Sequence, residues 1–469
     1  MKKNVVIVGA GISGLAAGWF LKQRFGDSID LKILEASNRP GGWIRSEQCG
    51  SFLFESGPRS CRTRGGAIET LRLIEALGLQ DQVIAASSTA STRYLYTEGK
   101  LQQLPNSLLS FFTSPLMRGV IPALWRELWQ PSGHSEDESI ASFISRRFGK
   151  NITERFFNPL VSGVYAGNMH HLSIKSCFPD LYRLEQESGS IIKGLFSKKR
   201  GKIEKTPFIE KILKHPIFSF KRGMETITHR LQEELAKEIS LESPVVDMHL
   251  MSDHVVLLTA SGQRIEADHV LLATPIEATA SMLSTISPEL GAEIRSIPTA
   301  TVAVVNMGWN EKVLPYEGFG YLIPSSEKEE ILGVVWDSSV FPQQNQTPSQ
   351  TRLTVMLGGI HHPEVTKMSD DQLVKCSNRA LAKHLHFKSP PDVVRVVMAK
   401  QAIPQYPVNH HLKMKFIEDT LSKVSASRVQ LIGSSWHGVS IHDCISDAKR
   451  VCDASFSLFG TNYAPKKSG

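Results

Sequence analysis

Hydrophobic residues near the N-terminus follow two patterns that are separated by a glycine-rich turn. A short β-branched run at Val5–Val8 is typical of a buried strand, and apolar residues then recur with helical spacing from Leu15 to Leu21. A second apolar run covers Leu31–Leu34. The pattern predicts a strand, a tight turn, a helix and a second strand, which together begin a doubly wound nucleotide-binding fold.

The turn between these elements carries Gly9, Gly11 and Gly14. In such a turn the first glycine permits the sharp reversal, the second lets the backbone approach a pyrophosphate, and the third lets the helix pack closely on the strand. Glu35 follows the second strand, where its carboxylate can accept hydrogen bonds from ribose hydroxyls and would repel a 2′-phosphate. These features predict a dinucleotide and leave FAD and NAD as alternatives.

A second loop after Glu35 distinguishes the two cofactors. It contains the glycine pair Gly41 and Gly42, against which a cofactor can lie, and the cations Arg39 and Arg45, which can meet phosphates. A site for NAD alone has no need of this loop, so we expect FAD. Here the sequence resembles the flavin amine oxidase superfamily, in which an acidic residue followed by Arg-x-Gly-Gly marks an FAD site.

Further motifs, in order along nearly the whole chain, resemble the protoporphyrinogen/coproporphyrinogen oxidase family of that superfamily. They are Gly42–Ser46, Phe54–Arg59, Gly163–Asn168, Leu172–Pro179, Gly318–Gly320, Pro324–Glu327, Val355–Gly359, Ile403–Tyr406 and Gly438–Ile445. The resemblance implies an FAD-dependent oxidase of haem biosynthesis. Such an oxidase converts protoporphyrinogen IX to protoporphyrin IX, with flavin N5 accepting hydride and molecular oxygen accepting the electrons.

The same resemblance, together with the turn, indicates which residues bind the cofactor. A strand predicted at Val429–Ile432, a turn at Gly433–His437 and a helix from Val439 would aim a second helix N-terminus at the flavin. Val246 looks like a residue beside the adenine. The expected cofactor-binding residues are Gly9, Gly11, Ile12, Ser13, Gly14, Glu35, Arg39, Gly41, Gly42, Trp43, Arg45, Gly57, Pro58, Arg59, Val246, Gly433, Trp436, Val439, Ser440 and Ile441.

For the substrate, the resemblance implies an apolar slot and a carboxylate-binding cation. Leu322, Val335 and Met356 look like the residues that clamp the macrocycle, Arg93 looks like the propionate-binding arginine, and Gly163 would offer its carbonyl to pyrrole N–H groups. Without the resemblance, the apolar residues would be ordinary core and Arg93 a solvated surface residue. No residue stands out as a general base.

Several positions leave alternatives open or depart from the family. Arg59 could lie near the flavin or the substrate, but an internal ion pair with Glu55 is the simpler interpretation. Tyr165, Trp336 and His437 stand where the family leads us to expect phenylalanine, tyrosine and an acidic or small residue. These departures could alter the polarity of the pocket.

Charge and composition argue against some classes of partner. The net charge is +7, and the basic residues are scattered apart from a run between Lys198 and Lys205 that reads as a solvated loop. Nucleic-acid binding needs a basic face with a recognisable module, which the sequence lacks, so we expect no nucleic-acid partner. The histidine pairs His361–His362 and His410–His411 would point apart on a strand, so we expect no metal.

The location of the protein is predicted from cysteines and hydropathy. The six cysteines form no CxxC pair, which favours a reducing compartment, and the first apolar strand begins too early for a signal peptide. The segment Leu104–Trp129, which includes Arg118 and Arg126, suits an interfacial membrane surface, the rim of a substrate entrance or the core of a helical subdomain. We expect a cytoplasmic monomer or homodimer, with peripheral attachment to the inner face of the membrane left open.

At 469 residues the chain is long enough for two or three domains. We expect α/β and α+β architecture: a discontinuous Rossmann-like FAD domain, a mixed-sheet substrate domain and a mainly helical, membrane-associating lobe. The expected FAD-domain segments are 1–84, 201–281 and 400–469. The expected substrate-domain segments are 85–103 and 282–399, and the lobe covers 104–200.

Three other functions remain as alternatives. Coproporphyrinogen III has more propionates and would use a wider polar entrance, so extra basic residues near the entrance would favour its oxidation. An amine oxidase would carry an aromatic cage residue in its C-terminal motif, whereas Val439–His442 offers none. A flavin-binding scaffold without turnover would tolerate replacement of Arg93.

Overall fold

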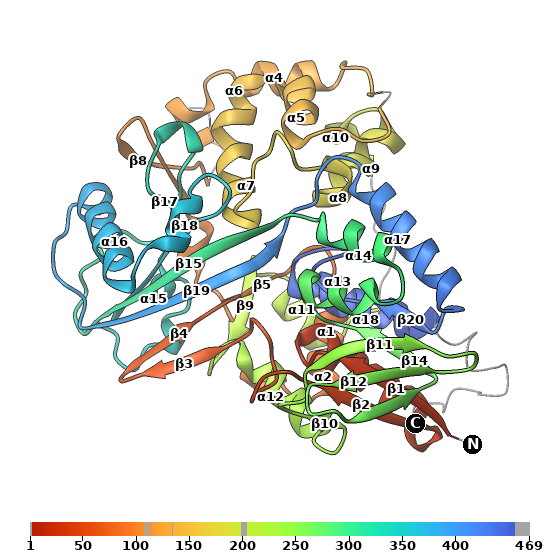
Figure 1. Cartoon of the computed structure of the whole chain (residues 1–469). Coiled ribbons are helices and arrows are strands. Elements are labelled where there is room, and N and C mark those ends of the chain that lie inside the picture. Colours follow the sequence, from red (N-terminus) through yellow and green to blue (C-terminus); the bar gives the residue numbers. More distant parts are fainter. Residues whose placement is uncertain (1, 107–109, 112–113, 134, 198–203, 455–469) are drawn as a thin grey trace.

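The computed structural model describes residues 2–454, apart from 107–109, 112–113, 134 and 198–203 (Figure 1). A five-stranded sheet contains the N-terminal strand, and every neighbouring pair in it runs parallel. In order across the sheet, its strands are β10 (Ile239–Ser240), β2 (Ile29–Leu34), β1 (Lys3–Val8), β14 (His269–Leu272) and β20 (Val429–Leu431). The sheet therefore unites strands from the start, middle and end of the chain.

Both faces of this sheet are buried, because successive residues of a strand point to opposite sides. Val5 and Ile7 of β1 face one core, whereas Val6 and Val8 face another. The first core includes α1 (Ile12–Phe25), α2 (Ala67–Ala76), α11 (Pro207–Ile212), α12 (Glu225–Glu234) and α18 (Ile441–Ala454). The second includes the antiparallel strands β11 (Val245–Leu250), β12 (Val255–Thr259) and β13 (Arg264–Ala267) with α13 (Ile276–Ser284), α14 (Pro288–Arg295) and α17 (His410–Val424).

A seven-stranded mixed sheet forms the second large unit, on the left of Figure 1. In order, its strands are β19 (Val393–Pro404), β15 (Thr299–Trp309), β18 (Thr351–Gly358), β17 (Ile331–Val335), β16 (Gly320–Leu322), β7 (Tyr94–Thr97) and β8 (Lys100–Gln103). Only β16 and β7 pair in parallel among these strands. Helix α16 (Asp370–Leu385) buries its apolar face against one side of this sheet.

Smaller elements connect these units. Two further sheets pair β3 (Ser46–Cys49) with β4 (Phe52–Glu55), and β5 (Cys61–Arg62) and β6 (Val83–Ala85) with β9 (Ile217–Phe220). Short helical segments are η1 (Gly26–Ser28), η2 (Gln80–Gln82), η3 (Ser88–Ser91), η6 (Ser325–Glu327), α15 (Asp337–Val340), η7 (Pro342–Gln344) and η8 (Pro363–Lys367).

A helical lobe lies at the top of Figure 1. It contains η4 (Pro115–Met117), α4 (Val120–Glu127), α5 (Ile140–Phe148), α6 (Lys150–Ile152), the π-helical turn η5 (Thr153–Phe157), α7 (Asn158–Tyr165), α8 (Ile174–Cys177), α9 (Pro179–Ser188) and α10 (Ile191–Ser197). Residues 107–109 and 112–113 of the predicted apolar segment, and 198–203 of the basic run, lie outside the described residues.

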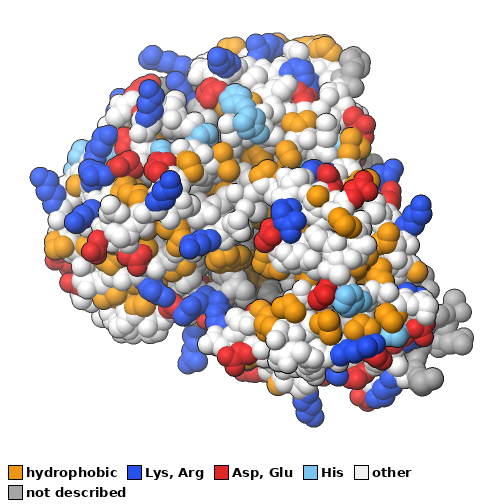
Figure 2. All heavy atoms as spheres, in the orientation of Figure 1, with side chains coloured by type: hydrophobic (Ala, Val, Ile, Leu, Met, Phe, Trp, Pro, Cys, Tyr) orange, Lys and Arg blue, Asp and Glu red, His pale blue; other side chains and the backbone are white. Residues whose placement is uncertain are grey.

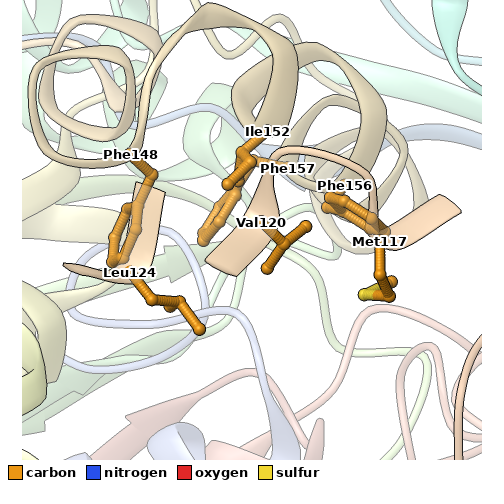
Figure 3. A pocket seen from close by; sticks show the side chains of 7 residues that line it. All are labelled: Met117, Val120, Leu124, Phe148, Ile152, Phe156 and Phe157. Carbon is orange, nitrogen blue, oxygen red and sulfur yellow. The ribbon is translucent and has the colours of Figure 1, made fainter. Parts of the chain in front are cut away.

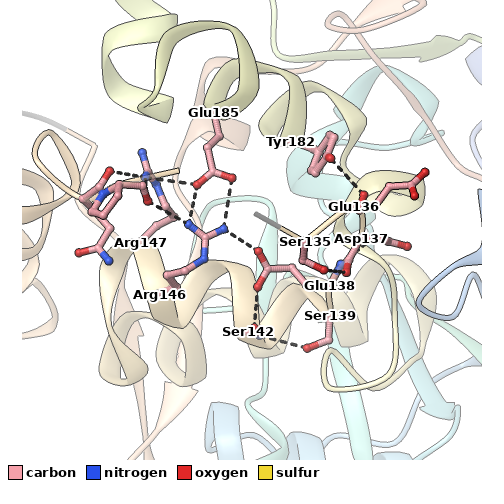
Figure 4. A network of polar contacts seen from close by, with 12 residues as sticks. Ser135, Glu136, Asp137, Glu138, Ser139, Ser142, Arg146, Arg147, Tyr182 and Glu185 are labelled. Atoms are coloured by element: carbon pink, nitrogen blue, oxygen red, sulfur yellow. Dashed lines mark hydrogen bonds and ion pairs between the residues drawn. The ribbon is translucent and has the colours of Figure 1, made fainter. Parts of the chain in front are cut away.

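Charged residues connect the helices of this lobe, where Arg146 and Arg147 of α5 both pair with Glu185 of α9 (Figure 4). The Arg147 guanidinium is paired with the Glu127 carboxylate, and both side chains are fully buried. Glu127 also accepts hydrogen bonds from the Ser190 hydroxyl at 2.6 Å and from the Ile191 N–H at 2.8 Å. The carboxylate thus caps the start of α10 while it neutralises a cation from α5, so α4, α5 and α10 share one polar centre.

The structure adjusts several sequence-based expectations. His410 and His411 begin helix α17 rather than lying on a strand, because Pro407 and Asn409 form the turn that starts it. Met282 lies inside α13 and packs in the core of the parallel sheet, so a domain boundary after Ile297 fits the packing better than one at 282. No helix in the described ranges is both long and apolar enough to cross a membrane.

Candidate cofactor and substrate site

The glycine turn has the geometry that a bound pyrophosphate requires. Gly9 has a φ of +101°, and a Cβ there would lie 2.6 Å from the Ala273 carbonyl oxygen. A Cβ on Gly14 would lie 1.9 Å from the Gly9 carbonyl oxygen, so helix and strand are as close as backbones can be. A Cβ on Gly11 would meet nothing within 4 Å. The space beside Gly11 is therefore open at the helix N-terminus, where backbone N–H groups attract an anion.

Glu35 is held at this turn by backbone donors. One carboxylate oxygen accepts a hydrogen bond from the Ala10 N–H at 2.7 Å, and the other accepts from the Ser37 N–H at 2.9 Å. The main chain of Glu35 also accepts from the Ser243 N–H at 2.8 Å, close to β11 and the exposed side chain of Val246. This arrangement brings the expected ribose-binding acid and the expected adenine neighbour to the same end of the parallel sheet.

The second glycine loop lies directly against the first. The Gly41 N–H donates to the Ala10 carbonyl at 2.8 Å, and a Cβ on Gly42 would lie 3.2 Å from the Gly11 Cα. Arg39 supports this loop by donating to the Gly42 carbonyl at 2.6 Å. The two glycine loops together therefore leave an open backbone surface on which a long dinucleotide could lie.

The acidic partners of the loop arginines were not foreseen from the sequence. Arg39 pairs with Glu225 at 3.3 Å, and Arg45 pairs with Glu47 at 2.5 Å. Both arginines hold protein groups in the structure, so a role of either one in contacting phosphate stays a prediction.

Two further segments reach this region from elsewhere in the chain. A Cβ on Gly57 would lie 2.0 Å from the Trp43 carbonyl oxygen, so the loop of Gly57, Pro58 and Arg59 abuts the second glycine loop. Gly433, with a φ of +120°, faces the Ser13 hydroxyl, from which its Cβ would be 3.5 Å away. The expected cofactor residues of the N-terminal and C-terminal segments are thus neighbours, next to Ile12 at the start of α1.

The C-terminal helix begins with a reciprocal cap. The Ser440 hydroxyl donates to the Asp443 carboxylate at 2.6 Å and accepts from the Asp443 N–H at 3.2 Å. Helix α18 begins at Ile441, two residues after the predicted start at Val439. Trp436 is buried just before it, and among the described residues its indole N–H has no hydrogen-bond partner. An orphaned buried donor at this point is consistent with a ligand that completes the site.

The predicted ion pair between Arg59 and Glu55 is wrong. Arg59 pairs instead with Asp337 of α15 at 3.4 Å. Glu55 accepts hydrogen bonds from the Met224 N–H at 2.8 Å and the Ser46 hydroxyl at 2.8 Å, and burial raises the pKa of its carboxyl group to about 8. Glu55 is therefore mostly protonated at neutral pH, and the cation next to it is free to bind an acid from another segment.

The three apolar residues expected to clamp the substrate lie on one face of the seven-stranded sheet. Leu322 of β16 and Met356 of β18 are both opposite Gly333 of β17. Val335 lies two residues beyond Gly333 on the same strand, so its side chain points to the same side. All three side chains are half-buried. Gly333 carries no side chain, and the Leu322 side chain packs over it, 3.1 Å from where a Cβ would lie.

Helix α7 and Arg93 border this apolar face. A Cβ on Gly163 of α7 would lie 2.6 Å from a terminal methyl group of Leu322. The Arg93 guanidinium lies over the ring of Phe319, with 5.2 Å from its Cζ to the ring centroid. Phe319 packs in one cluster with Val335. Gly163, Arg93 and the three apolar residues therefore form one neighbourhood, although each comes from a different strand, helix or loop.

Sequence reasoning missed the polar contacts at the edge of this face. The hydroxyl of Thr354, which lies beside Val335 on β18, is 2.7 Å from both the Asn306 side-chain oxygen and the Asp337 carboxylate, and it can donate its one proton to either. Asp337 also holds Arg59. No local motif marks these residues, and only the strand register could have placed them together.

The three residues that depart from the family pattern have defined partners. The Tyr165 hydroxyl donates to the Cys177 carbonyl at 2.9 Å, and His437 pairs with Glu418 at 2.7 Å. Trp336 is fully buried and stacks on Tyr316. Within the described residues, no group of three or more His, Cys, Asp or Glu side chains is arranged to hold a metal ion.

Comparison with known proteins gives one consistent relationship. A model of the family described as flavin containing amine oxidoreductase matches residues 12–454. Human protoporphyrinogen oxidase is 34% identical over 98% of this chain and 99% of its own length. The coproporphyrinogen III oxidase of Bacillus subtilis is 26% identical over 98% of this chain and 99% of its own length. The crystal structure of an assigned protoporphyrinogen oxidase from Exiguobacterium sp. 255-15 is similar at a TM-score of 0.82 and 25% identity, over 98% of this chain and 99% of that one.

Proposed function

The chain belongs to the flavin containing amine oxidoreductase family and, within it, to the protoporphyrinogen oxidases, and we propose that its preferred substrate is protoporphyrinogen IX. It is an FAD-dependent oxidoreductase that oxidises a porphyrinogen in haem biosynthesis. The relatives include both protoporphyrinogen and coproporphyrinogen oxidases, and the protoporphyrinogen oxidases reach the higher identity.

The cofactor site of this chain fits FAD. The open space at Gly11 suits the pyrophosphate, and the carboxylate of Glu35 suits the ribose. We propose that Gly433, Ser440 and the indole N–H of Trp436 border the flavin end of the site. Bound FAD would supply the hydride acceptor for the reaction.

The observation that best supports porphyrinogen as the substrate is the shared face of Leu322, Val335 and Met356. A porphyrinogen is a broad, largely apolar ring that must be held with one methylene bridge against the hydride acceptor. The half-buried apolar side chains around Gly333 offer such a surface, because they have no polar groups that need hydrogen-bond partners. The protein would mainly align the ring and exclude water from it, since the bound cofactor would supply the hydride acceptor.

Polar groups around this face would fix the orientation of the ring. We propose that Arg93 binds a propionate, because a guanidinium can form a bidentate pair with a carboxylate. Gly163 lies in the last turn of α7, where carbonyl groups lack a helical N–H partner. Its carbonyl oxygen can therefore accept a hydrogen bond from a pyrrole N–H. We assign no general base, so a ring proton would leave to solvent by tautomerisation.

The substrate preference is tested by offering each porphyrinogen to the purified protein without oxygen. Air is then admitted and the fluorescence of the porphyrin product is followed. A higher kcat/KM for protoporphyrinogen IX than for coproporphyrinogen III is the expected result, and the reverse order would reassign the substrate. Loss of turnover in Arg93→Ala with unchanged flavin content would argue against a flavin-binding scaffold.

We also propose that molecular oxygen accepts the electrons, as the resemblance of the motifs to the porphyrinogen oxidase family implies. Each two-electron step would then release one hydrogen peroxide, and a porphyrinogen needs three such steps to become aromatic. The peroxide formed per porphyrin is measured with a peroxidase-coupled dye. Turnover that proceeds only when a quinone is added would contradict this proposal.

Membrane attachment is a third proposal, and the helical lobe supports it. Met117, Val120, Leu124, Phe148, Ile152, Phe156 and Phe157 line a hollow of about 240 Å³ in this lobe, and their side chains point toward one another (Figure 3). Near it, Trp125 is 68% exposed, and Phe196 of α10 is 89% exposed. Exposed apolar and aromatic side chains beside cations, such as Lys193 over the Trp129 ring, are typical of an interfacial surface.

Vesicle binding tests the membrane proposal. Trp125→Ser combined with Phe196→Ser should reduce co-sedimentation with vesicles that contain phosphatidylglycerol. Phe416→Ser, which removes an exposed aromatic residue from α17, outside the helical lobe, is the matched control. Equal binding by the control, the double variant and the parent protein would contradict an interfacial role for this surface.

A further inference from the structure

Two arginines that the motifs did not mark lie next to the cofactor helix and the substrate face. Arg62 belongs to β5, where it pairs with Ile217 of β9, and its carbonyl oxygen contacts the His442 ring nitrogen of α18 at 2.5 Å. A Cβ on Gly66 would lie 3.3 Å from the His442 Cβ, so the whole segment from Arg62 to Gly66 packs along α18. Arg64 lies within this segment.

The same apolar cluster supports both this segment and Arg93. Ile217, which is the strand partner of Arg62, packs in one cluster with Phe319 and Val335. Phe319 is the ring beneath the Arg93 guanidinium, and Val335 is one of the three apolar residues of the substrate face. Because directly opposite residues of an antiparallel pair point to the same face, the Arg62 side chain lies on the Ile217 side of β9, beside the cluster that also supports Arg93.

These three guanidinium groups have no acidic counterpart in the described part of the chain. No Asp or Glu oxygen lies within 4.0 Å of Arg62, Arg64 or Arg93 there, whereas most other arginines near the site are paired. Burial lowers the pKa of Arg93, and the charges of Arg62 and Arg64 lower it further. Arg62 and Arg93 border the same apolar cluster, so positive charge gathers there, and a bound anion would offset it.

We propose that Arg62 and Arg64 act with Arg93 as a carboxylate-recognition cluster that binds the two neighbouring propionates of the porphyrinogen. This proposal rests on the proposed function and extends it from one cation to three. Two adjacent carboxylates would offset two of the three positive charges, and each can accept a bidentate pair of hydrogen bonds from a guanidinium. A substrate without free carboxylates would leave the three cations unpaired beside a largely apolar face.

The cluster makes Arg62 and Arg64 specificity-determining residues rather than catalytic ones. Coproporphyrinogen III shares the same neighbouring pair of propionates, so the cluster accepts both porphyrinogens and selects for the free acid over the ester. Because both arginines are exposed, each contact should be worth only a three- to tenfold change in binding.

The decisive comparison uses the FAD-loaded enzyme, protoporphyrinogen IX and its dimethyl ester. Arg62→Gln combined with Arg64→Gln should raise KM for the acid about tenfold, with kcat at saturation and flavin content unchanged. The ester should have the same KM in this variant and in the parent protein. Arg264→Gln on β13 makes a single charge change of the same kind far from the site and should alter none of these values.

Other outcomes would overturn the proposal. An unchanged KM for the acid, or an acid-to-ester ratio that stays at the parent value, would show that the two arginines do not contact the propionates. A loss of flavin from the double variant would assign them to the cofactor instead.

If the parent protein oxidises no porphyrinogen, the proposed function is wrong, but the carboxylate-recognition cluster can still be tested by binding. Binding of oxidised protoporphyrin, followed by quenching of its fluorescence, then tests the cluster. A weaker affinity in the double variant than in Arg264→Gln would still support it, and equal affinities would exclude it.

Discussion

Alanine at Gly11 and alanine at Gly14 should have opposite consequences, although the two glycines are three residues apart in one turn. The Cβ of Gly14→Ala would lie 1.9 Å from the Gly9 carbonyl oxygen, which is more than 1 Å closer than a normal contact. Backbone atoms cannot move aside as the end of a flexible side chain can. Strand β1 and helix α1 would have to separate, and we expect a loss of at least about 4 kcal/mol in the free energy of unfolding.

Gly11→Ala should leave the apoprotein almost unchanged. Gly11 has a φ of −68° and a ψ of 176°, which alanine adopts without strain, and nothing lies within 4 Å of the added Cβ. Alanine is a poorer N-cap than glycine, but it also lowers the entropy of the unfolded chain, so the two effects should nearly cancel. The methyl group would instead occupy the space into which the pyrophosphate must come, so FAD binding should fail.

The assay is urea unfolding of both variants with and without added FAD. FAD at one hundred times its dissociation constant should stabilise the parent protein by about 2.7 kcal/mol. Gly11→Ala should match the parent apoprotein to within about 1 kcal/mol and gain nothing from FAD. Gly14→Ala should be severely destabilised in both conditions. FAD-dependent stabilisation of Gly11→Ala equal to that of the parent would refute the placement of the pyrophosphate at this turn.

Three further changes test other parts of the structure. The carboxyl group of Glu55 has a pKa raised from 4.5 to about 8, so its stabilising effect is complete below pH 4.5 and is lost as the pH rises to about 8. Glu55→Gln should abolish this pH dependence. Between pH 4.5 and 8, its free energy of unfolding, measured in urea, should fall by up to about 1.4 kcal/mol less per pH unit than that of the parent. Arg147→Ala should cost about 3–5 kcal/mol in thermal unfolding, because Glu127 would stay buried without its cation; a cost below about 1 kcal/mol would show that the pair is dispensable. Gly163→Ala should raise KM for the porphyrinogen while flavin content stays constant, because its Cβ would push Leu322 into the substrate face; unchanged kinetics would remove α7 from the site.

The sequence was most informative where the fold depends on neighbouring residues. Gly9, Gly11 and Gly14 lie in one turn, and their roles follow from steric requirements that any strand–turn–helix imposes. The identity of the acid after the second strand could be read in the same way, and the structure places the Glu35 carboxylate against the Ala10 N–H of that turn. Local geometry thus makes this part of the site predictable.

Contacts between distant segments were less accessible. Arg59 and Asp337 are separated by 278 positions, and nothing in either stretch identifies the partner of Arg59, so the nearer Glu55 was a natural but wrong choice. Leu322, Val335 and Met356 share a face only because Leu322 and Met356 both pair with Gly333, two residues before Val335. Family resemblance named these residues, whereas hydrophobic pattern alone could not have told them from core.

The surface charges show a similar limit. On the face shown in Figure 2, lysine and arginine side chains are interspersed with aspartate and glutamate, so the net charge of +7 gathers into no single broad basic patch there. The unpaired state of Arg62 and Arg64 is visible only when the positions of all nearby acids are known. A count of basic residues therefore could not have located the carboxylate-recognition cluster.

A polar path explains how the substrate face keeps its position relative to the cofactor loops. Asn306 of β15 donates to the Glu55 carbonyl at 3.1 Å. The Thr354 hydroxyl lies 2.7 Å from both the Asn306 side-chain oxygen and the carboxylate of Asp337, the partner of Arg59, and can donate its proton to either. These bonds are directional and buried, so they resist sliding of the seven-stranded sheet over β4 in a way that apolar packing does not. Hydride transfer requires the reacting atoms to meet within about 3–3.5 Å. The path from Glu55 to Arg59 therefore ties the substrate face to the cofactor loops, and we expect it to hold the distance between them that hydride transfer needs.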